Sequence, residues 1–325
     1  MSDYAMVLPA PGGPEMFERR AIAIPVPAPG EIVVRQTAVG LNYLDTYHRT
    51  GLYPWPQPSD LVIGSEGAGV VEAAGPGVDI PVGTRVAYTW PMGAYCSVRA
   101  IPASRVALIP EGVSDTDAAA AMLKGLTAQY LVRSTYPIQA GDVALVHAAA
   151  GGVGLLLGQW IKALGATAIG VAGGPEKCAL ALEHGHAHVI DSKAEDFAER
   201  VKQITDGALC NVVYDGVGAS TWRGSLACLR PRGMFVSFGQ ASGPIDGFSL
   251  ADLSKGGSLF ACRPSLFNHI ATRAELDARA AEMFARMADG SVRIEAARAL
   301  KLEDVADVHR LLESRATTGA TVMIP

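Results

Sequence analysis

Basic charge and cysteine are both sparse in this chain of 325 residues. Charged residues make up 18%, and 27 Lys and Arg against 32 Asp and Glu give a formal net charge of −5. Without a basic excess the chain lacks the electrostatic footprint of a nucleic-acid-binding protein, so we expect no nucleic-acid partner. Hydrophobic residues make up 49%, which excludes disorder.

The five cysteines are an odd number, widely spaced, and form no C-x-x-C pair. Neither a disulfide framework nor a cysteine-rich zinc site is expected, and a reducing compartment, the cytoplasm, is the expected location. The cysteines are Cys96, Cys178, Cys210, Cys228 and Cys262.

The sequence also lacks the features expected of a signal peptide or a membrane span. Residues 1–13 lack the basic region and apolar stretch of a signal peptide. Val143–Ile161 is a run of nineteen residues without Asp, Glu, Lys or Arg, which is near the length of a membrane span. It contains His147, Gln159 and four glycines, begins like a strand and ends like a helix. We therefore expect a globular chain with no membrane partner.

The length predicts two domains, and the first third is β-rich. Strands are expected at Ile32–Val39, Gly69–Glu72 and Arg85–Tyr88, separated by glycine and proline. This punctuation is typical of a compact antiparallel or barrel-like domain. No parallel crossover is visible before about residue 120.

From residue 142 strands alternate with helices, which is the signature of a parallel, doubly wound sheet. Past residue 263 the pattern returns to two helices and a closing strand. We expect a Rossmann domain over residues 126–265 and a β-rich domain over 1–125 that 266–325 completes. The strands are expected at 143–147, 167–171, 188–190, 212–215, 234–238 and 320–324, and the helices at 152–164, 175–184, 194–205, 219–229, 273–289 and 302–314.

A dinucleotide fingerprint lies between the first strand and the first helix of this alternation. Ala149 takes the first glycine position, and Gly151 and Gly154 take the next two. Gly151 would let the backbone approach a pyrophosphate, Gly154 would let the helix pack against the strand, and the helix N-terminus supplies amide donors. A plain tight turn is the alternative interpretation.

The end of the second strand favours NADPH over NADH. An NAD site carries an acid about twenty residues after the fingerprint, but here the chain reads Ala-Gly-Gly-Pro over 172–175. Lys177 follows in the next helix and Lys193 follows the third strand, so a 2′-phosphate would meet one or two ammonium groups. Glu176 has the opposite charge, although it can face solvent.

Other chemistry-bearing residues have plainer interpretations. His184, His186 and His188 straddle a helix end and a strand start, because Gly185 is a helix C-cap candidate, so we expect no metal site there. Cys96 is expected to be a buried hydrophobe rather than a reactive thiol. The pair Asp45 and His48, three residues apart, proves little by itself, and the tyrosines of a loop over 42–53 can serve packing or binding equally.

Together these motifs resemble the medium-chain dehydrogenase/reductase superfamily, and within it the zinc-free quinone oxidoreductase branch, the zeta-crystallin-like family. The resemblance runs from residue 42 to the C-terminus. The matching stretches are N-Y-L-D-T-Y-H-R-T-G-L-Y-P (42–54), G-S-E-G-A-G (64–69), M-L-K-G-L-T-A-Q-Y (122–130), the turn at 148–154, Y-D-G-V-G (214–218), R-P-S (263–265) and E-S-R-A-T (313–317).

The resemblance implies a GroES-like catalytic domain beside the Rossmann domain, with no zinc. Zinc-dependent relatives place a cysteine near position 42 and a histidine before Glu66, where this chain has Asn42 and Ser65, and it lacks their four-cysteine lobe. Reduction of an electron-poor acceptor is then easier than oxidation of an alcohol.

The resemblance also implies roles for individual residues. Asn42, Thr127 and Tyr130 would lie near the nicotinamide, and Tyr47 and Tyr53 would hydrogen-bond the substrate oxygen. Close relatives often carry tyrosine where this chain has Ser192, and Lys193 would compensate. The catalytic candidates are Tyr47, Tyr53 and Asn42. The cofactor-binding candidates are Asn42, Thr127, Tyr130, Gly151, Gly152, Val153, Gly154, Gly173, Gly174, Lys177, Ser192, Lys193, Val217, Phe238, Gly239, Arg263, Pro264, Ser265 and Arg315.

The function that follows is an NADPH-dependent quinone reductase that works without zinc in the cleft between its domains. Reduction of an activated C=C bond in an enone, enoyl thioester or haloacrylate is the alternative, with Tyr53 as proton donor. A non-catalytic NADPH-binding protein is a further alternative. The resemblance also implies a homodimer, with pairing expected through the last Rossmann strand, around residues 257–261, because a two-fold axis would remove that exposed edge.

Overall fold

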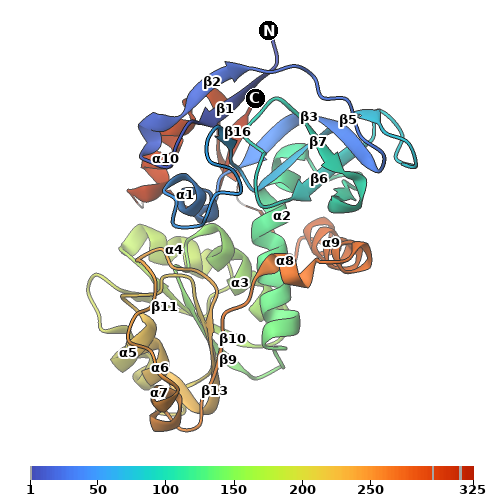
Figure 1. Cartoon of the computed structure of the whole chain (residues 1–325). Helices are drawn as coiled ribbons and strands as arrows, with labels where there is room; N and C mark the ends of the chain where they lie inside the picture. Colours follow the sequence, from blue (N-terminus) through green and yellow to red (C-terminus); the bar gives the residue numbers. More distant parts are fainter. Residues whose placement is uncertain (1, 295, 315–316) are drawn as a thin grey trace. The chain divides into compact units, whose positions relative to one another are not determined.

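The computed structural model describes residues 2–294, 296–314 and 317–325 (Figure 1). The chain forms two compact units, the first from residues 1–126, 270–288 and 294–325 and the second from residues 127–269 and 289–293. The sequence analysis placed the divisions after residues 125 and 265. That division into folding domains remains a prediction.

A six-stranded parallel sheet forms the centre of the second unit, in the order β11-β10-β9-β12-β13-β14. Since β9 is central, the chain winds to one side through β10 and β11 and then to the other through β12 to β14, which confirms the predicted Rossmann arrangement. The strands are β9 (Val143–His147), β10 (Thr167–Ala172), β11 (His188–Asp191), β12 (Cys210–Asp215), β13 (Leu229–Ser237) and β14 (Phe260–Cys262).

Apolar side chains on both faces of this sheet are covered by helices. Leu145, Ile169 and Val213 pack with Val201 of α5 and Trp222 of α6 on one face. Side chains alternate along a strand, so the intervening residues point to the other face, where α3 and α4 pack on β9 and β10. The helices are α3 (Gly152–Ala163), α4 (Pro175–Glu183), α5 (Phe197–Ile204), α6 (Trp222–Ala227), α7 (Leu250–Lys255) and α8 (Leu266–His269).

Two of these helices begin three residues later than the sequence predicted. Asp196 caps α5, because its carboxylate accepts hydrogen bonds from the amides of Ala198 and Glu199. Before α6, the carboxylate of Asp215 accepts the hydroxyl of Thr221, which keeps the segment before Trp222 in a turn.

A seven-stranded, mostly antiparallel sheet forms the core of the first unit, in the order β15-β16-β3-β5-β6-β8 with β7 paired to β3. Its strands are β3 (Glu31–Gly40), β5 (Glu66–Ala74), β6 (Arg85–Thr89), β7 (Val98–Pro102), β8 (Val106–Leu108), β15 (Ala296–Lys301) and β16 (Ala320–Ile324). A three-stranded sheet, β2-β1-β4, adds β1 (Tyr4–Leu8), β2 (Glu18–Ala21) and β4 (Leu61–Val62).

The first unit contains elements that the sequence analysis missed. The tyrosine-rich segment, interpreted as a loop, includes the helix α1 (Tyr43–Arg49), and the strand β15 was not predicted. The helix α2 (Asp115–Tyr130) was also missed; it begins in the first unit and its last four residues belong to the second. Its alanine-rich sequence favours a helix, but it is buried on most sides and shows little apolar periodicity. The helices α9 (Arg273–Ala288) and α10 (Val305–Glu313) were predicted.

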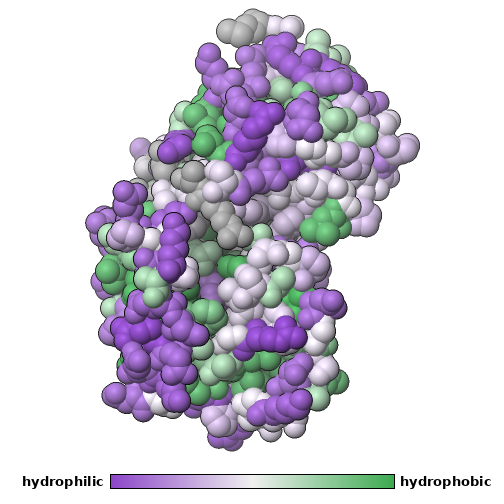
Figure 2. All heavy atoms as spheres, turned by 90° about the vertical axis from the view of Figure 1, so that its left-hand side faces the viewer, coloured by the Kyte–Doolittle hydropathy of each residue, from purple (hydrophilic) through white to green (hydrophobic). Residues whose placement is uncertain are grey.

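The long uncharged run at 143–161 is divided between β9 and α3. Within the described ranges, none of the helices has the length and hydrophobicity needed to cross a bilayer. On the face shown in Figure 2, hydrophilic side chains predominate and hydrophobic ones occur in small patches among them. Such scattered apolar exposure is ordinary for a globular surface.

Two buried histidines are held neutral by the fold. Burial, with Arg49 beside it, lowers the pKa of His309 to about 3, and burial lowers the pKa of His186 to about 4. A pKa lowered on folding gives stability that is present above the ordinary value of 6.5 and is lost as the pH falls through the folded value. Asp45 acts in the opposite sense, because burial raises its pKa to about 6 and its contribution is lost as the pH rises.

We therefore expect the protein to be less stable at pH 5 than at pH 7, by at least about 2 kcal/mol, since His309 and His186 outweigh Asp45 and burial also lowers the pKa of His48 and His147. Urea denaturation at both pH values measures the difference, and His309→Gln should reduce it. Equal or greater stability at pH 5 would contradict this assignment.

Candidate functional site

The turn before α3 has the geometry of a phosphate cradle. Gly151 is the N-cap of α3, and its amide donates to the carbonyl of Ala148 at 2.8 Å. Ala148 has a φ of 52°, a left-handed conformation that closes the turn tightly. A Cβ at Gly154 would lie 2.3 Å from the Ala148 carbonyl oxygen, so only glycine fits there. The amides of Gly152 and Val153, in the first turn of the helix, remain available for an anion.

A second group of predicted residues lies together at the ends of β10 and β11. Gly174, with a φ of 97°, is the N-cap of α4. A Cβ built on Gly174 would lie 3.8 Å from Lys193 Nζ, and a Cβ built on Gly173 would lie 3.7 Å from Ser192 Oγ. Lys177 is half-buried in the first turn of α4. The structure thus brings Gly173, Gly174, Ser192 and Lys193 into one place.

The carboxyl ends of β12 and β13 are fastened to each other. The Asp215 carboxylate accepts the amides of Val217 and Gly218 at 2.8 and 3.0 Å, and its carbonyl accepts the amide of Phe238 at 2.9 Å. A Cβ at Gly239 would lie 2.5 Å from the Gly216 carbonyl oxygen. Val217, Phe238 and Gly239 therefore lie together in the well-packed loops that follow the carboxyl ends of β12 and β13.

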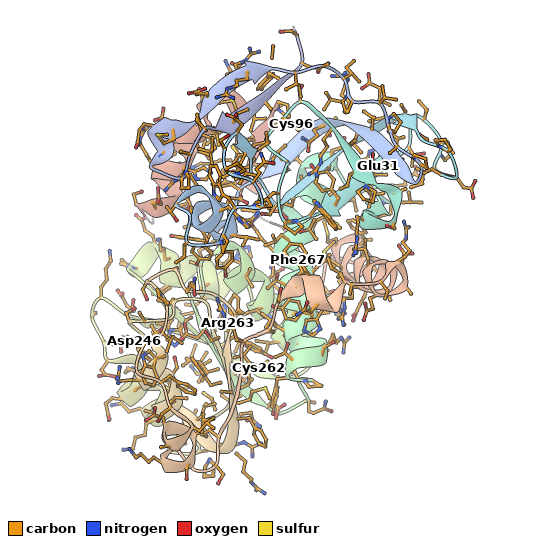
Figure 3. All side chains as sticks on the ribbon, viewed as in Figure 1. Glu31, Cys96, Asp246, Cys262, Arg263 and Phe267 are labelled. Atoms are coloured by element: carbon orange, nitrogen blue, oxygen red, sulfur yellow. The ribbon has the colours of Figure 1, made fainter. Side chains whose placement is uncertain are left out.

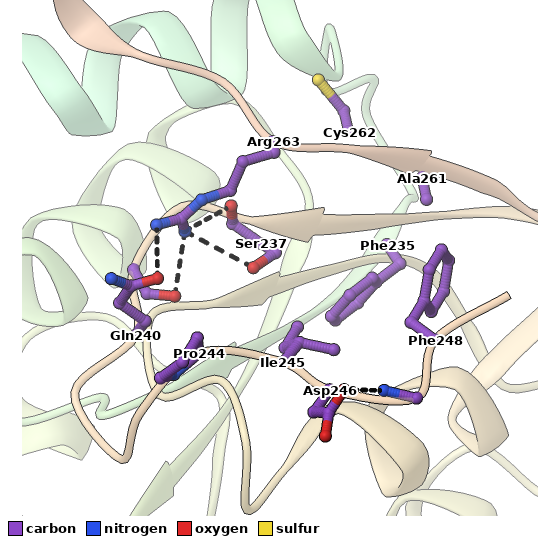
Figure 4. Close-up of a pocket in the computed structure, with 12 residues that line it drawn as sticks. Phe235, Ser237, Gln240, Pro244, Ile245, Asp246, Phe248, Ala261, Cys262 and Arg263 are labelled. Atoms are coloured by element: carbon purple, nitrogen blue, oxygen red, sulfur yellow. Dashed lines mark hydrogen bonds between the residues drawn. The ribbon is translucent and has the colours of Figure 1, made fainter.

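A cavity of about 630 Å³ opens beside the carboxyl end of β13, within the second unit (Figure 4). Arg263 borders it, and its guanidinium donates to the carbonyls of Ser237 at 2.8 Å and Gly239 at 3.0 Å. Figure 3 shows Arg263 and Cys262 in the second unit and Cys96 in the first. The lining residues are Phe235, Ser237, Gly239, Gln240, Pro244, Ile245, Asp246, Gly247, Phe248, Ala261, Cys262 and Arg263.

Thr127 and Tyr130 are buried near the end of α2. The ring of Tyr130 stacks on His269, with ring centroids 4.4 Å apart and planes 11° apart. Burial raises the pKa of Tyr130 well above its usual range, so its phenol is neutral. Pro264 and Ser265 form the short link between β14 and α8.

In the first unit Asn42 is held by a buried ion pair. Asn42 Nδ2 donates to Glu66 Oε1 at 2.9 Å, and the ammonium of Lys124 donates to the same oxygen. The backbone amide of Leu123 donates to Glu66 Oε2 at 2.6 Å. The Glu66 side chain is 0% exposed and that of Lys124 8% exposed. These contacts fix the Asn42 side chain at the start of α1.

A second buried carboxylate lies next to this pair. Asp45 accepts the hydroxyls of Ser65 at 2.6 Å and Tyr95 at 2.9 Å, and the amide of Asn42 at 2.9 Å. Tyr95 Oη lies 3.1 Å from His309 Nε2. This network locks the first turn of α1 to the segments that precede β5 and β7, and to α10.

Tyr47 and Tyr53 contact each other, with ring centroids 5.4 Å apart. Both are half-buried, and the amide of Tyr53 donates to the Tyr47 carbonyl at 3.0 Å. His48 packs edge-on against Tyr53, with ring centroids 5.6 Å apart, and burial lowers its pKa. The two predicted substrate tyrosines therefore form one aromatic surface at the end of α1.

The predicted residues thus form two groups, Asn42 with Tyr47 and Tyr53 in the first unit, and the remaining described candidates in the second. Arg315 lies outside the described residues. Sequence reasoning missed Glu66, Lys124, Asp45 and Asp191 as organising residues. In the sequence, Glu66 and Lys124 look like ordinary charged residues, because nothing local shows that the fold buries them. Only the family resemblance at 64–69 and 122–130 pointed to the region that contains them.

Two plainer interpretations are confirmed. His184 is the C-cap of α4, Gly185 has a φ of 91°, and His188 begins β11, so the three histidines do straddle a helix end and a strand start. Cys96 is buried, and burial raises the pKa of its thiol to about 11.

A Rossmann sheet with a glycine cradle, in one chain with a β-rich unit that contains a polar site, is the combination typical of a nucleotide-dependent oxidoreductase of the medium-chain class. Comparison with protein families agrees. Residues 28–141 match the alcohol dehydrogenase GroES-like domain, and residues 152–284 match the zinc-binding dehydrogenase family.

Closely similar proteins narrow the class further. The chain is 49% identical to a quinone oxidoreductase of Pseudomonas aeruginosa over 97% of both chains. It belongs to the zeta-crystallin-like, quinone oxidoreductase branch of the medium-chain dehydrogenase/reductase superfamily, as the sequence motifs predicted.

Two further similarities bear on chemistry. A crystal structure of Escherichia coli quinone oxidoreductase complexed with NADPH superposes with a TM-score of 0.96 at 44% identity, covering 99% of this chain and 100% of that one. A 2-haloacrylate reductase of a Burkholderia species is 40% identical over 99% of this chain and 98% of its own length.

The matched family is named for zinc, but this chain's residues do not fit the metal. Asn42 Nδ2 and Ser65 Oγ, at the positions where zinc-dependent relatives have a cysteine and a histidine, donate hydrogen bonds to Glu66 and Asp45. Amide and hydroxyl groups are poor zinc ligands beside thiolate and imidazole. Among the described residues, no cluster of three or more His, Cys, Asp or Glu is placed to hold a metal ion.

The Glu66–Lys124 pair yields a stability prediction. Lys124→Met should lower the free energy of unfolding by about 3–5 kcal/mol, because it leaves the Glu66 carboxylate buried without its cation. Adding Glu66→Gln should restore part of the loss, since it removes the unpaired buried charge, while its one carbonyl oxygen can accept from either Asn42 or Leu123. Urea denaturation of the single and double variants measures both effects.

Arg20→Met is the matched control, because Arg20 pairs with Glu18 and Asp60 on the surface. It should cost less than about 1 kcal/mol. If Lys124→Met is no more destabilising than this control, the buried pair does not have the role assigned to it.

Proposed function

We propose that this protein is an NADPH-dependent quinone reductase that acts without a metal. The observation that carries the proposal is the glycine cradle with Lys193 Nζ over the Gly173–Gly174 turn, in a chain of this family. The overall reaction is NADPH + H⁺ + quinone → NADP⁺ + quinol, which balances in atoms and charge.

The residues of the second unit fit a 2′-phosphorylated dinucleotide. The amides of Gly152 and Val153 would hold the pyrophosphate, and Gly173, Gly174, Ser192, Lys177 and Lys193 the 2′-phosphate. The Escherichia coli relative with NADPH supports this choice. When bound, NADPH supplies a hydride from C4 of its nicotinamide.

The remaining candidates of that unit would complete the cofactor site. Thr127 and Tyr130 would orient the nicotinamide, and neutral Tyr130, held by the His269 stack, brings no charge to it. Arg263, Pro264 and Ser265 would continue the wall that Val217, Phe238 and Gly239 begin. Arg315, outside the described residues, stays a predicted member of the cofactor site.

In the first unit, Asn42 would orient the cofactor, and Tyr47 and Tyr53 would hydrogen-bond the substrate oxygen. The Asn42 amide is prevented from rotating by its bond to Glu66, and the two tyrosines present apolar ring surface beside their hydroxyls. Such a site would act chiefly by positioning the reactants and burying them from water. A quinone is electron-poor enough to accept a hydride without further electrophilic help.

The test is oxidation of NADPH, followed at 340 nm, with 1,4-benzoquinone and 9,10-phenanthrenequinone beside an enone and a crotonyl thioester. Turnover with the quinones, and much less with the alkenes, is the expected result. Turnover with alkenes alone would overturn the proposal. Binding of NADPH without turnover of any acceptor would favour a non-catalytic NADPH-binding protein.

Reduction of an activated C=C bond is the second candidate, favoured by the similarity to a 2-haloacrylate reductase. In that reaction a proton must reach carbon, and Tyr53 is the donor to test. If alkenes are the substrates, Tyr53→Phe should lower kcat by about 100-fold. For quinones we expect less than about a threefold change, because the quinol oxygens take protons from water.

Tyr47→Phe is the matched control, since it removes a hydroxyl from the neighbouring ring of the same surface. A large kcat loss with quinones in Tyr53→Phe alone would contradict the positioning role given to both tyrosines.

We further propose a homodimer, in the cytoplasm, with a small-molecule quinone or other electron-poor acceptor as substrate. β14 is the last strand of the second unit's sheet, and Phe260 on it is 56% exposed. An edge strand with an exposed aromatic residue is a pairing surface, and a two-fold axis would remove the edge from both copies. The five free cysteines suit a reducing compartment.

Sedimentation should give a mass of twice 33.8 kDa at micromolar concentration. Phe260→Glu should shift the protein to monomer, because it places a charge on the pairing edge. Leu250→Glu, on α7 and at an 80% exposed position, is the control that should leave the dimer intact. A wild-type monomer would remove the dimer proposal.

A further inference from the structure

Asp191 ends β11 and lies against the turn that would receive the 2′-phosphate. Its Oδ1 accepts two backbone hydrogen bonds, from the amide of Gly174 at 2.8 Å and from the amide of Lys193 at 2.9 Å. The Lys193 and Gly174 amides lower the pKa of Asp191, so its carboxylate is ionised at neutral pH. One oxygen therefore bridges the turn after β10 and the turn after β11.

This bridge determines where the Lys193 side chain begins. With its backbone held against Gly174, Lys193 extends across the glycine turn, placing Cε 3.6 Å from the missing Cβ of Gly173 and Nζ 3.8 Å from that of Gly174. Ser192 is held in the same turn, because its amide donates to the Ala172 carbonyl at 2.9 Å and its hydroxyl to the same carbonyl at 3.2 Å.

An acid at the end of the second strand argues for NADH, because a carboxylate there accepts the ribose hydroxyls and repels a 2′-phosphate. Asp191 ends the third strand instead, and it reaches the same turn through the Gly174 amide. Here Asp191 Oδ1 is engaged by the amides of Gly174 and Lys193, and the Lys193 ammonium lies 3.8 Å from the Cβ position of Gly174. The carboxylate thus acts on the site through Lys193 rather than directly.

We propose that Asp191 is a positioning residue for nucleotide specificity: by holding Lys193 over the Gly173–Gly174 turn, it makes the site select a 2′-phosphorylated ribose. This inference rests on the proposed NADPH dependence and adds to it a residue that neither the dinucleotide fingerprint nor the predicted phosphate contacts include.

The two roles open to Asp191 predict opposite changes in NADPH affinity when its carboxylate is removed. If Asp191 positions Lys193, Asp191→Ala should weaken binding of NADPH and of 2′,5′-ADP by about tenfold, the value of one charge-assisted hydrogen bond. Binding of NADH and 5′-AMP should change by less than about twofold. If Asp191 instead repels the phosphate, the same variant should bind NADPH more tightly, and that result would overturn the proposal.

Isothermal titration with 2′,5′-ADP and 5′-AMP gives a readout that does not depend on turnover. Asp191→Asn keeps an oxygen that can accept both amides, so its preference for 2′,5′-ADP should remain close to that of the wild type. Lys193→Ala should lose the preference, and adding Asp191→Ala to it should cause little further loss. Independent, additive losses would contradict action through Lys193.

Asp196→Ala is the matched control. Asp196 also accepts two backbone amides and also carries one negative charge, but it caps α5 instead of joining the two turns. It should lower stability without changing the ratio of the two affinities. A wild-type protein that binds 5′-AMP as tightly as 2′,5′-ADP would refute the NADPH proposal itself, whereas a wild-type preference that Asp191→Ala leaves intact would refute only the role of Asp191.

Discussion

The buried Glu66 carboxylate is the interaction on which the polar interior of the first unit depends. It joins three elements, since it belongs to β5, accepts from Asn42 at the start of α1, and accepts from Leu123 and Lys124 in α2. Two charges taken from water are favourable only when further hydrogen bonds satisfy them, and here Asn42 and Leu123 donate to the Glu66 carboxylate beside Lys124. The start of α1, and through it the tyrosine surface, is placed by Glu66 together with the neighbouring Asp45 network.

In the second unit the corresponding constraint is that backbone segments pass too close to one another to leave room for a Cβ. No Cβ fits at Gly154, and none fits at Gly239 without displacing Gly216. Side chains are excluded where a cofactor's phosphates and ribose would need the backbone, while carboxylates such as Asp215 and Asp191 hold the intervening turns by their amides. The unit thus offers amide donors at fixed positions, and lysine supplies the charge.

Much of this could be predicted from the sequence, and the reasons are physical. The strands and helices from residue 143 to 238 follow from alternating short apolar runs and glycine turns, and the fingerprint at 149–154 fixes where a dinucleotide would bind. The helix α1 was missed, because its tyrosines and polar residues lack an apolar stripe. The roles of Lys124 and Asp191 were missed as well, because burial and hydrogen-bonding to distant amides depend on the tertiary fold.

The central claim is that this chain's own side chains, without a metal, suffice for reduction. The most direct test is the rate of benzoquinone reduction by NADPH after dialysis against a strong zinc chelator, compared with the untreated protein. An unchanged rate is predicted, because the positions equivalent to zinc ligands are occupied by Asn42 and Ser65, which are bonded to Glu66 and Asp45. A rate that is lost on chelation and restored by added Zn²⁺ would contradict the account.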